Sequence, residues 1–349
     1  MTQKNFASDN VTGACPEVLA ALAAANDGEV MPYGADPATA RVEAALAELF
    51  ETEVSVFPVA TGTACNALAH AACVPPWGVL YCHRISHAEV HECGAPEFFT
   101  HGAKLTGLPG EGAKLSPDDL EAVLRAAGKG DVHHVQPAAL TLTQATELGT
   151  VYRVEEIAAL AAVARGHGLS VHMDGARFAN ALVALGCTPA EMTWKAGVDV
   201  LSFGGTKNGC LAAEALVFFR RDLAANSHFQ RKRAGHLFSK MRFLSAQLEG
   251  YLSDEAWLRN ARAANAATAR LAEGLSALPG VSLAAPAESN QLFVRLPKQT
   301  IAALQAQGWG FYVMGEEIRL VTGWSTTAAD ADAFVAAVAA SLQERTAAE

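Results

Sequence analysis

Short apolar runs and helix-like segments alternate through the middle of this chain. The runs Gly78–Tyr81, Leu169–Met173 and Val198–Leu201 have the length of strands. Between them lie stretches with apolar residues at spacings of three and four, such as Val154–His167, which Gly168 closes. Strands that alternate with helices build a mostly parallel sheet covered on both faces. The chain is therefore predicted to be an α/β protein whose mostly parallel sheet is sandwiched by helices.

The remaining elements follow from the same patterns and from turn chemistry. Ser116 and Pro117 predict the capped start of a helix that runs to about Ala127. Further strands are predicted at 54–57, 132–136, 140–143 and 215–219, and further helices at 66–72 and 176–185.

The pattern changes after Arg242. A long helix is predicted at 257–278, followed by strands at 291–295 and 318–321 and a terminal helix from about 328. A chain of 349 residues suits one large domain plus a smaller one. We expect a large domain over residues 1–250, with its N-terminal segment contributing to the active site, and a smaller C-terminal α+β domain over residues 251–349.

Composition excludes several classes of function. Hydrophobic residues make up 51% and charged residues 18%, so a sizeable core can be buried. A net charge of −10 argues against a nucleic-acid partner. No apolar stretch approaches the ~18 residues that a membrane span needs, and the first residues lack an apolar signal core. Seven scattered cysteines without a CxxC pair predict reduced thiols and a cytoplasmic protein.

Lys207 and Asp174 each follow directly after a predicted strand. Lys207 lies in the Gly-rich turn Ser202–Gly209, and Asp174 ends the run that begins at Leu169. The carboxyl ends of strands in open α/β sheets are where ligands bind. A lysine that forms a Schiff base and an acid that keeps a pyridinium protonated are the pair that pyridoxal 5'-phosphate (PLP) enzymes need. The sequence therefore predicts a PLP site at this edge of the sheet.

Thr61-Gly62-Thr63 lies between a predicted strand and a predicted helix. Backbone N–H groups and the helix dipole at such a position attract a phosphate. An ordinary helix cap by Thr61 or Thr63 is the alternative explanation. With Lys207 and Asp174, cofactor binding is the favoured interpretation.

At this point the chain closely resembles the low-specificity L-threonine aldolases, including the phenylserine aldolases, of the aspartate aminotransferase fold group. The resemblance covers nearly the whole chain. Its most specific parts are the Ser-Asp-Asn start, the Tyr-Gly-x-Asp-Pro element and the Asp-Gly-Ala-Arg run, in that order. The matching segments are Phe6–Thr12, Met31–Pro37, Ala60–Thr63, His87 with Glu92 and Gly94, His172–Arg177 and Thr206-Lys207.

The resemblance implies a retro-aldol enzyme that cleaves L-threonine, L-allo-threonine and other β-hydroxy-α-amino acids to glycine and an aldehyde. It implies a homo-oligomer, usually a dimer of dimers, whose sites form between subunits. The implied cofactor-binding residues are Lys207, which is also catalytic, Asp174, Arg177 near the ring hydroxyl, Gly62 and Thr63 at the phosphate, and Lys232 from the neighbouring subunit. The implied substrate-side residues are His87, which stacks on the ring and is the candidate base, Ser8 and Arg319 at the carboxylate, and Tyr33 from across the dimer interface.

Two positions depart from the family pattern. Many members carry glutamine where this chain has Ala64, so one phosphate contact is expected to move to the backbone or to Asn66. Others carry a second active-site histidine at a place that Glu147 is expected to occupy here. The hydroxyl proton would then go to His87, to a water molecule or to Glu147 itself.

Several alternatives remain open from sequence alone. His83, His87 and His91 recur every four residues, a spacing that suits zinc on a helix, although Gly94 and Pro96 leave such a helix little room. No metal is therefore expected. Lys232 lies in a run of three basic residues that is commonly a solvated face, and Arg319 pairs equally well with a structural carboxylate. A β-eliminating lyase or an aminotransferase would share Lys207 and Asp174.

Overall fold

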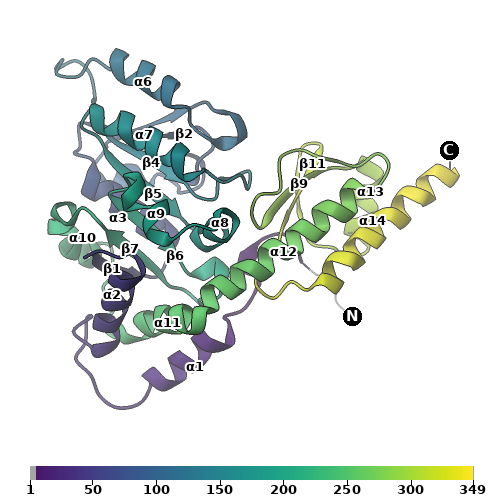
Figure 1. The fold of residues 1–349 in the computed structure, drawn as a ribbon, viewed down its shortest axis with the longest axis horizontal. Helices are drawn as coiled ribbons and strands as arrows, with labels where there is room; N and C mark the ends of the chain where they lie inside the picture. The colour runs from purple at the N-terminus through teal and green to yellow at the C-terminus, as the bar shows by residue number, and fades with distance from the viewer. Residues whose placement is uncertain (1–4, 349) are drawn as a thin grey trace.

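A seven-stranded sheet forms the larger part of the molecule. The computed structural model describes residues 5–348 (Figure 1). The strand order is β1-β7-β6-β5-β4-β2-β3, and among the described strands of this sheet only β7 runs antiparallel to its neighbours. The strands are β1 (Ser55–Val59), β2 (Gly78–His83), β3 (Lys104–Leu108), β4 (Gln136–Thr143), β5 (Ser170–Gly175), β6 (Val200–Gly204) and β7 (Glu214–Phe218). The predicted mostly parallel α/β sheet is confirmed.

Alternate residues of each strand enter different apolar cores, because successive side chains point to opposite faces. Val200 of β6 packs with Leu68 of helix α3, whereas Leu201 packs with Leu160 of α7 and Leu182 of α8. The helices are α1 (Pro16–Ala25), α2 (Pro37–Leu49), α3 (Gly62–Cys73), α4 (His87–Val90), α5 (Ala95–Phe99), α6 (Pro117–Ala126), α7 (Val154–Gly166), α8 (Phe178–Leu185), α9 (Pro189–Met192), α10 (Ser227–Arg233) and α11 (Arg242–Leu252).

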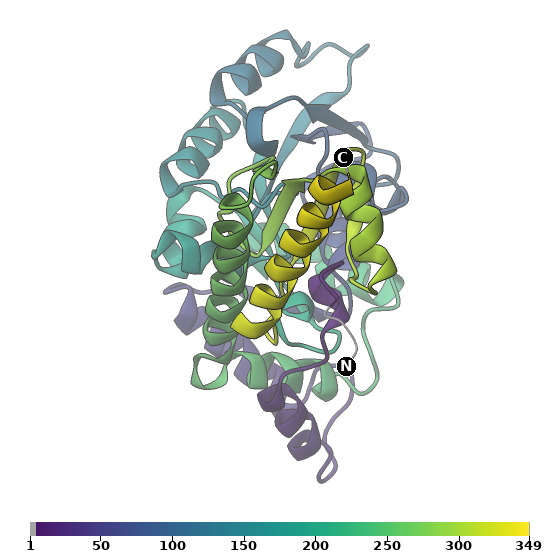
Figure 2. The same ribbon diagram turned by 90° about the vertical axis from the view of Figure 1, so that its right-hand side faces the viewer.

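A four-stranded antiparallel sheet follows in the C-terminal part, with the order β10-β11-β9-β8. Helices α12 and α14 lie side by side across it (Figure 2). The N-terminal Phe6 packs in the apolar core of this part, which ties the start of the chain to its end. The elements are α12 (Ala256–Ser276), β8 (Ser282–Leu283), β9 (Gln291–Arg295), α13 (Lys298–Ala306), β10 (Tyr312–Met314), β11 (Glu317–Val321) and α14 (Ala328–Ala348).

One predicted strand is wrong. Residues 131–135 form a turn, in which the N–H of His134 donates to the carbonyl of Asp131 at 3.1 Å. Val132 is 93% exposed, so its β-branched side chain has nothing to pack against. Strand β4 begins only at Gln136, and the other predicted elements appear within a few residues of their expected bounds. The domain division near residue 250 stays a prediction. Within residues 5–348, no helix is long and apolar enough to cross a membrane.

Candidate functional site

A cavity of about 660 Å³ opens at the carboxyl edge of the large sheet. It is closed on one side by the C-terminal part, which contributes Phe293, Tyr312 and Arg319. Eight of the ten residues that sequence analysis assigned to the site line it: Ser8, Gly62, Thr63, His87, Asp174, Arg177, Lys207 and Arg319. The sequence therefore identified most of one continuous surface.

Lys207 lies in the short turn Thr206–Asn208 that follows β6. Burial lowers the pKa of its amine, and the positive charge of Arg177 lowers it further, against the opposing effects of Asp9, Asp174 and Glu214. A lysine amine is a nucleophile only when it is unprotonated. The site therefore favours the reactive form of Lys207.

Asp174 is held from two directions on the face of β5 that α3 covers. Its Oδ1 accepts a hydrogen bond from the backbone N–H of Ala176 at 3.0 Å, and its Oδ2 accepts one from the side chain of Asn66 at 2.9 Å. The carboxyl is 4% exposed in this arrangement. A buried acid with both oxygens anchored has the fixed position that pairing with a heterocyclic N–H requires.

The N-terminus of α3 forms part of the cavity wall. Thr61 caps the helix by accepting a hydrogen bond from the N–H of Ala64 at 3.2 Å, which leaves Gly62 and Thr63 to line the cavity. A Cβ added at Gly62 would meet nothing within 4 Å, so the backbone is open to a ligand there. Thr61 is therefore the helix cap, and the phosphate role of Gly62 and Thr63 stays a prediction.

His87 belongs to a chain of hydrogen bonds that sequence analysis missed. Its Nδ1 lies 2.9 Å from Oε1 of Glu92, and the same oxygen accepts from Asn66 at 2.8 Å. Because Asn66 also donates to Asp174, one amide connects the two carboxylates. Burial raises the pKa of Glu92, while its hydrogen bonds to His87 and Asn66 act in the opposite direction. Asn66 is thus committed to this chain rather than to a phosphate.

Arg177 pairs with a buried acid that sequence analysis did not single out. Its Nε and Nη2 donate to the two oxygens of Asp9 at 2.8 and 3.1 Å. Burial pushes the pKa of Asp9 upward, but the charges of Arg177 and Lys207 outweigh it and the pKa is lowered. Asp9 is therefore an anion at neutral pH, and the expected contact of Arg177 with a ring hydroxyl stays a prediction.

Arg319 and Ser8 lie together at the C-terminal side of the cavity. The guanidinium of Arg319 donates to the carbonyl of Ala7 at 3.2 Å and lies 5.0 Å from the ring centre of Tyr312. Its buried Nε has no hydrogen-bond partner among the described residues. The side chain thus keeps donor capacity for an anion, as the sequence prediction required.

Glu147 reaches the cavity from the loop after β4. Its Oε1 accepts a hydrogen bond from the backbone N–H of His87 at 2.8 Å, and its buried Oε2 has no partner among residues 5–348. Burial, with a further contribution from the negative charge of Asp174, raises its pKa to about 7. A carboxyl of this kind exchanges a proton near neutral pH.

Tyr33 and Lys232 are the two predicted site residues that do not line the cavity. They lie beside each other, with the Lys232 amine 4.8 Å from the ring centre of Tyr33. Tyr33 is 49% exposed. Their predicted roles concern a site on a neighbouring subunit and stay predictions.

The three histidines spaced for zinc do not share a helix. His83 ends β2, and its Nε2 lies 3.1 Å from the carbonyl of Gly110, whereas α4 begins only at His87. Among residues 5–348, no group of three or more metal-binding side chains has suitable geometry.

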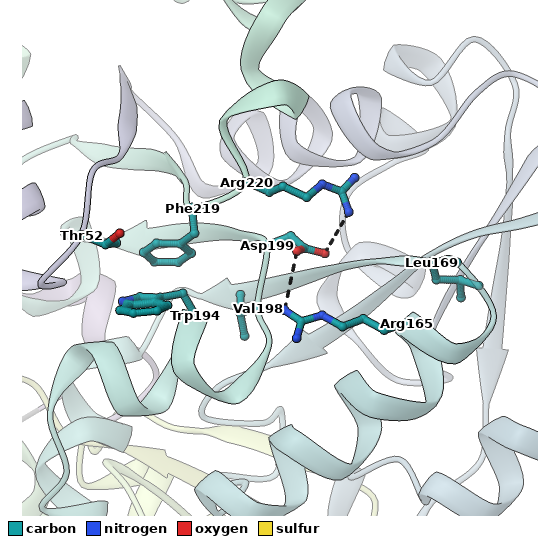
Figure 3. A pocket seen from close by; sticks show the side chains of 9 residues that line it. Thr52, Arg165, Leu169, Trp194, Val198, Asp199, Phe219 and Arg220 are labelled. Carbon is teal, nitrogen blue, oxygen red and sulfur yellow. Dashed lines mark hydrogen bonds and ion pairs between the residues drawn. The ribbon is translucent and has the colours of Figure 1, made fainter.

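A second cavity, of about 470 Å³, lies at the amino edge of the same sheet (Figure 3). Asp199 stands between Arg165 and Arg220, with nitrogen–oxygen distances of 4.0 and 3.5 Å. It also accepts a hydrogen bond from the N–H of Val171 at 2.8 Å. The charges here satisfy one another, and no lysine, histidine or cysteine of the described chain lines this cavity.

Comparison with known proteins agrees with this geometry. The model of the beta-eliminating lyase family matches residues 5–298. A low specificity L-threonine aldolase of Pseudomonas aeruginosa is 49% identical over 325 residues, which is 93% of each chain. One from a Pseudomonas species is 46% identical over the same share. The solved structure of a Leishmania major threonine aldolase covers 96% of this chain and 98% of its own, with a TM-score of 0.89 and 30% identity. The chain therefore belongs to the beta-eliminating lyase family, among its low-specificity L-threonine aldolases.

Proposed function

We propose that this chain cleaves L-threonine, L-allo-threonine and other β-hydroxy-α-amino acids such as phenylserine to glycine and an aldehyde, with PLP as its cofactor. The observation that carries the proposal is the meeting of Lys207, Asp174, His87 and Arg319 in one cavity. These four supply an amine, an acid, an imidazole and a carboxylate-binding cation, and the names of the relatives support the reaction.

The residues of the cavity fit PLP. The buried, pKa-lowered amine of Lys207 suits a bond to the cofactor aldehyde, and the anchored carboxyl of Asp174 suits the ring nitrogen. The open N-terminus of α3 at Gly62 and Thr63 suits the phosphate. When bound, PLP supplies an electron sink for the pair released from the broken Cα–Cβ bond.

Arg319 and Ser8 orient the substrate. The unpartnered Nε of Arg319 and the hydroxyl of Ser8 belong to residues that line the same cavity and would bind the substrate carboxylate. Fixing the carboxylate sets the rotation about the bond from the amine to Cα, and so decides which bond at Cα breaks. The substrate-side residues thus direct the chemistry to Cα–Cβ cleavage.

His87 is the proposed base for the β-hydroxyl. With Nδ1 bound to the buried Glu92, its other ring nitrogen is available to accept a proton. A histidine held by a carboxylate through one nitrogen has a fixed tautomer and orientation. Glu92 is in this proposal a positioning residue for His87.

We further place the enzyme in the cytoplasm as a homo-oligomer, a dimer of dimers. Tyr33 and Lys232 lie together on the surface, where they could complete the site of a neighbouring subunit, Lys232 at the phosphate. All seven cysteines lie within the described residues and are free, which fits a reducing compartment.

The decisive experiment incubates the purified protein with L-threonine and with L-phenylserine. Glycine should appear with equimolar acetaldehyde or benzaldehyde. Borohydride reduction should label the peptide that contains Lys207, and Lys207→Ala should abolish both results. A yellow, borohydride-labelled protein that releases no aldehyde would instead favour a β-eliminating lyase or an aminotransferase. An unlabelled Lys207 peptide would refute the cofactor assignment.

A further inference from the structure

Glu147 is a charged residue of the cavity to which the proposed function gives no role. It lies on the loop between β4 and α7, and its carboxyl contacts the first residue of α4 through the N–H of His87. That hydrogen bond occupies Oε1 and fixes the carboxyl in the wall of the cavity. Oε2 is therefore held in place without being used by the fold.

The free oxygen distinguishes Glu147 from Asp174, the other acid that lines the cavity, whose two oxygens are both hydrogen-bonded. Oε2 is buried and has no hydrogen-bond partner among the described residues. The backbone N–H groups of Glu147 and His87 and the side chain of Thr143 lower the pKa of the carboxyl, but Oε2 itself has no hydrogen-bond partner among the described residues. A buried carboxylate oxygen without a partner costs free energy, so its retention in a ligand cavity needs a functional reason.

The surroundings set the charge state of this carboxyl. Burial raises its pKa to about 7, and Asp174 acts in the same direction. An acid that titrates near 7 is ionised often enough to accept a proton and protonated often enough to return one. The charged and titratable groups around it come from several elements: Cys82 of β2, His87 of α4, His91 directly after α4, Glu92, Tyr152, Asp174 of β5, and the cavity-lining Arg177, Lys207 and Arg319.

We propose that Glu147 is a second catalytic acid–base residue, whose Oε2 takes the proton of the substrate β-hydroxyl and passes it to His87. The proposal rests on the proposed function and deepens it. In the cleavage direction the O–H bond breaks and its proton goes to Oε2. The electron pair of that bond forms the aldehyde C=O as the Cα–Cβ bond breaks and its electrons leave toward Cα. Oε2 then gives the proton to the free ring nitrogen of His87, which releases it to solvent, and Cα gains one, so the reaction balances.

Glu147→Gln tests this role, because the amide keeps the hydrogen bond to the N–H of His87 but cannot accept a second proton. We expect kcat/KM for L-threonine cleavage to fall about a hundredfold. In the wild type kcat/KM should rise with pH through about 7, since the base works only when ionised, and this limb should be lost or displaced in Glu147→Gln. A carboxyl carbon-13 signal that titrates near 7 in the cofactor-free wild type should be missing from the variant.

The matched control is Glu97→Gln. Glu97 lies on α5 outside the cavity and also carries a buried oxygen, Oε2, without a partner among residues 5–348. The same substitution there should leave kcat/KM and its pH profile unchanged. Glu147→Ala with added formate gives a second test, because a small carboxylate should restore part of the lost cleavage.

Exchange of the glycine α-hydrogen in D2O separates the outcomes, since it needs Lys207 and the cofactor but no hydroxyl base. Glu147→Gln should keep this exchange within about twofold of the wild type while cleavage falls. If Glu147→Gln lost glycine exchange together with cleavage, the role of Glu147 would be structural and the proposal would be overturned. The same would follow if kcat/KM of the variant still rose with pH through about 7. A wild type that exchanges glycine yet releases no aldehyde would refute the proposed function, and the role of Glu147 would fall with it.

Discussion

The two cavities at opposite edges of the large sheet differ in whether their charged groups have partners within the protein. At the amino edge, Asp199 is satisfied by Arg165, Arg220 and the N–H of Val171 (Figure 3). At the carboxyl edge, Oε2 of Glu147 and Nε of Arg319 are buried without hydrogen-bond partners among residues 5–348. Both edges carry acids and arginines, so composition does not separate them. The difference lies in whether the fold itself completes the interactions.

Charged groups that all have partners within the protein, here called a closed set, stabilise the fold. Charged groups at a cavity that lack a partner, here called an incomplete set, are available to a ligand. Buried polar groups are almost always hydrogen-bonded in native proteins, so an unpartnered group that also lines a cavity is a candidate for contact with a ligand. The carboxyl edge also contains a closed pair, Asp9 with Arg177, which holds the N-terminal segment against α8. That pair is the structural part of the site, and the incomplete groups are its reactive part.

The largest expected effect is that of Asp174→Asn at the carboxyl edge. An amide keeps the shape and the contact with Ala176 but cannot hold a proton on a ring nitrogen. We expect kcat to fall by about 10²- to 10⁴-fold, the range for removal of an acid–base partner. Steady-state cleavage of L-threonine and the near-visible absorbance of the loaded protein measure it. Activity within tenfold of the wild type would show that catalysis does not depend on the carboxylate of Asp174.

A smaller effect is expected from Glu92→Gln. The amide can still contact His87 and Asn66, but it no longer offers a charge to the imidazolium that forms when His87 takes a proton. We expect kcat to fall about tenfold to a hundredfold, as for other groups that orient a histidine. Nitrogen-15 spectra of His87 should show a changed tautomer. An altered kcat with an unchanged histidine spectrum would contradict the positioning role.

Sequence predicted the residues that sit at the ends of strands. The positions of Lys207 and Asp174 could be predicted because each follows an apolar run of strand length. That local pattern is enough to place a residue at the carboxyl end of a strand. The resemblance to a family added His87, Ser8 and Arg319, which line the same cavity. Their exact roles stay predictions, as do those of Tyr33 and Lys232.

What sequence could not predict are the partners. Arg177 and Asp9 lie 168 positions apart, and Asn66 and Asp174 lie 108 apart, so no local pattern reports either contact. The spacing of the histidines alone would suggest a helix, but Gly94 and Pro96 argue against one, and the structure has β2 ending at His83 and α4 beginning at His87. The predicted strand at 132–136 is wrong because β-branched residues there point to solvent.

Asp199→Asn repeats the Asp174 substitution at the amino edge, where the smallest catalytic effect is expected. The amide lacks the negative charge that pairs with Arg165 and Arg220, and its contact with the N–H of Val171 is weaker. We therefore expect the free energy of unfolding to fall by about 1–3 kcal/mol. The value of kcat should stay that of the wild type, because no reactive group lines this cavity. Urea unfolding and L-threonine cleavage, measured on both variants, test the pair. A loss of kcat without a loss of stability would mean that the closed set also serves catalysis, and the contrast between the two edges would then fail.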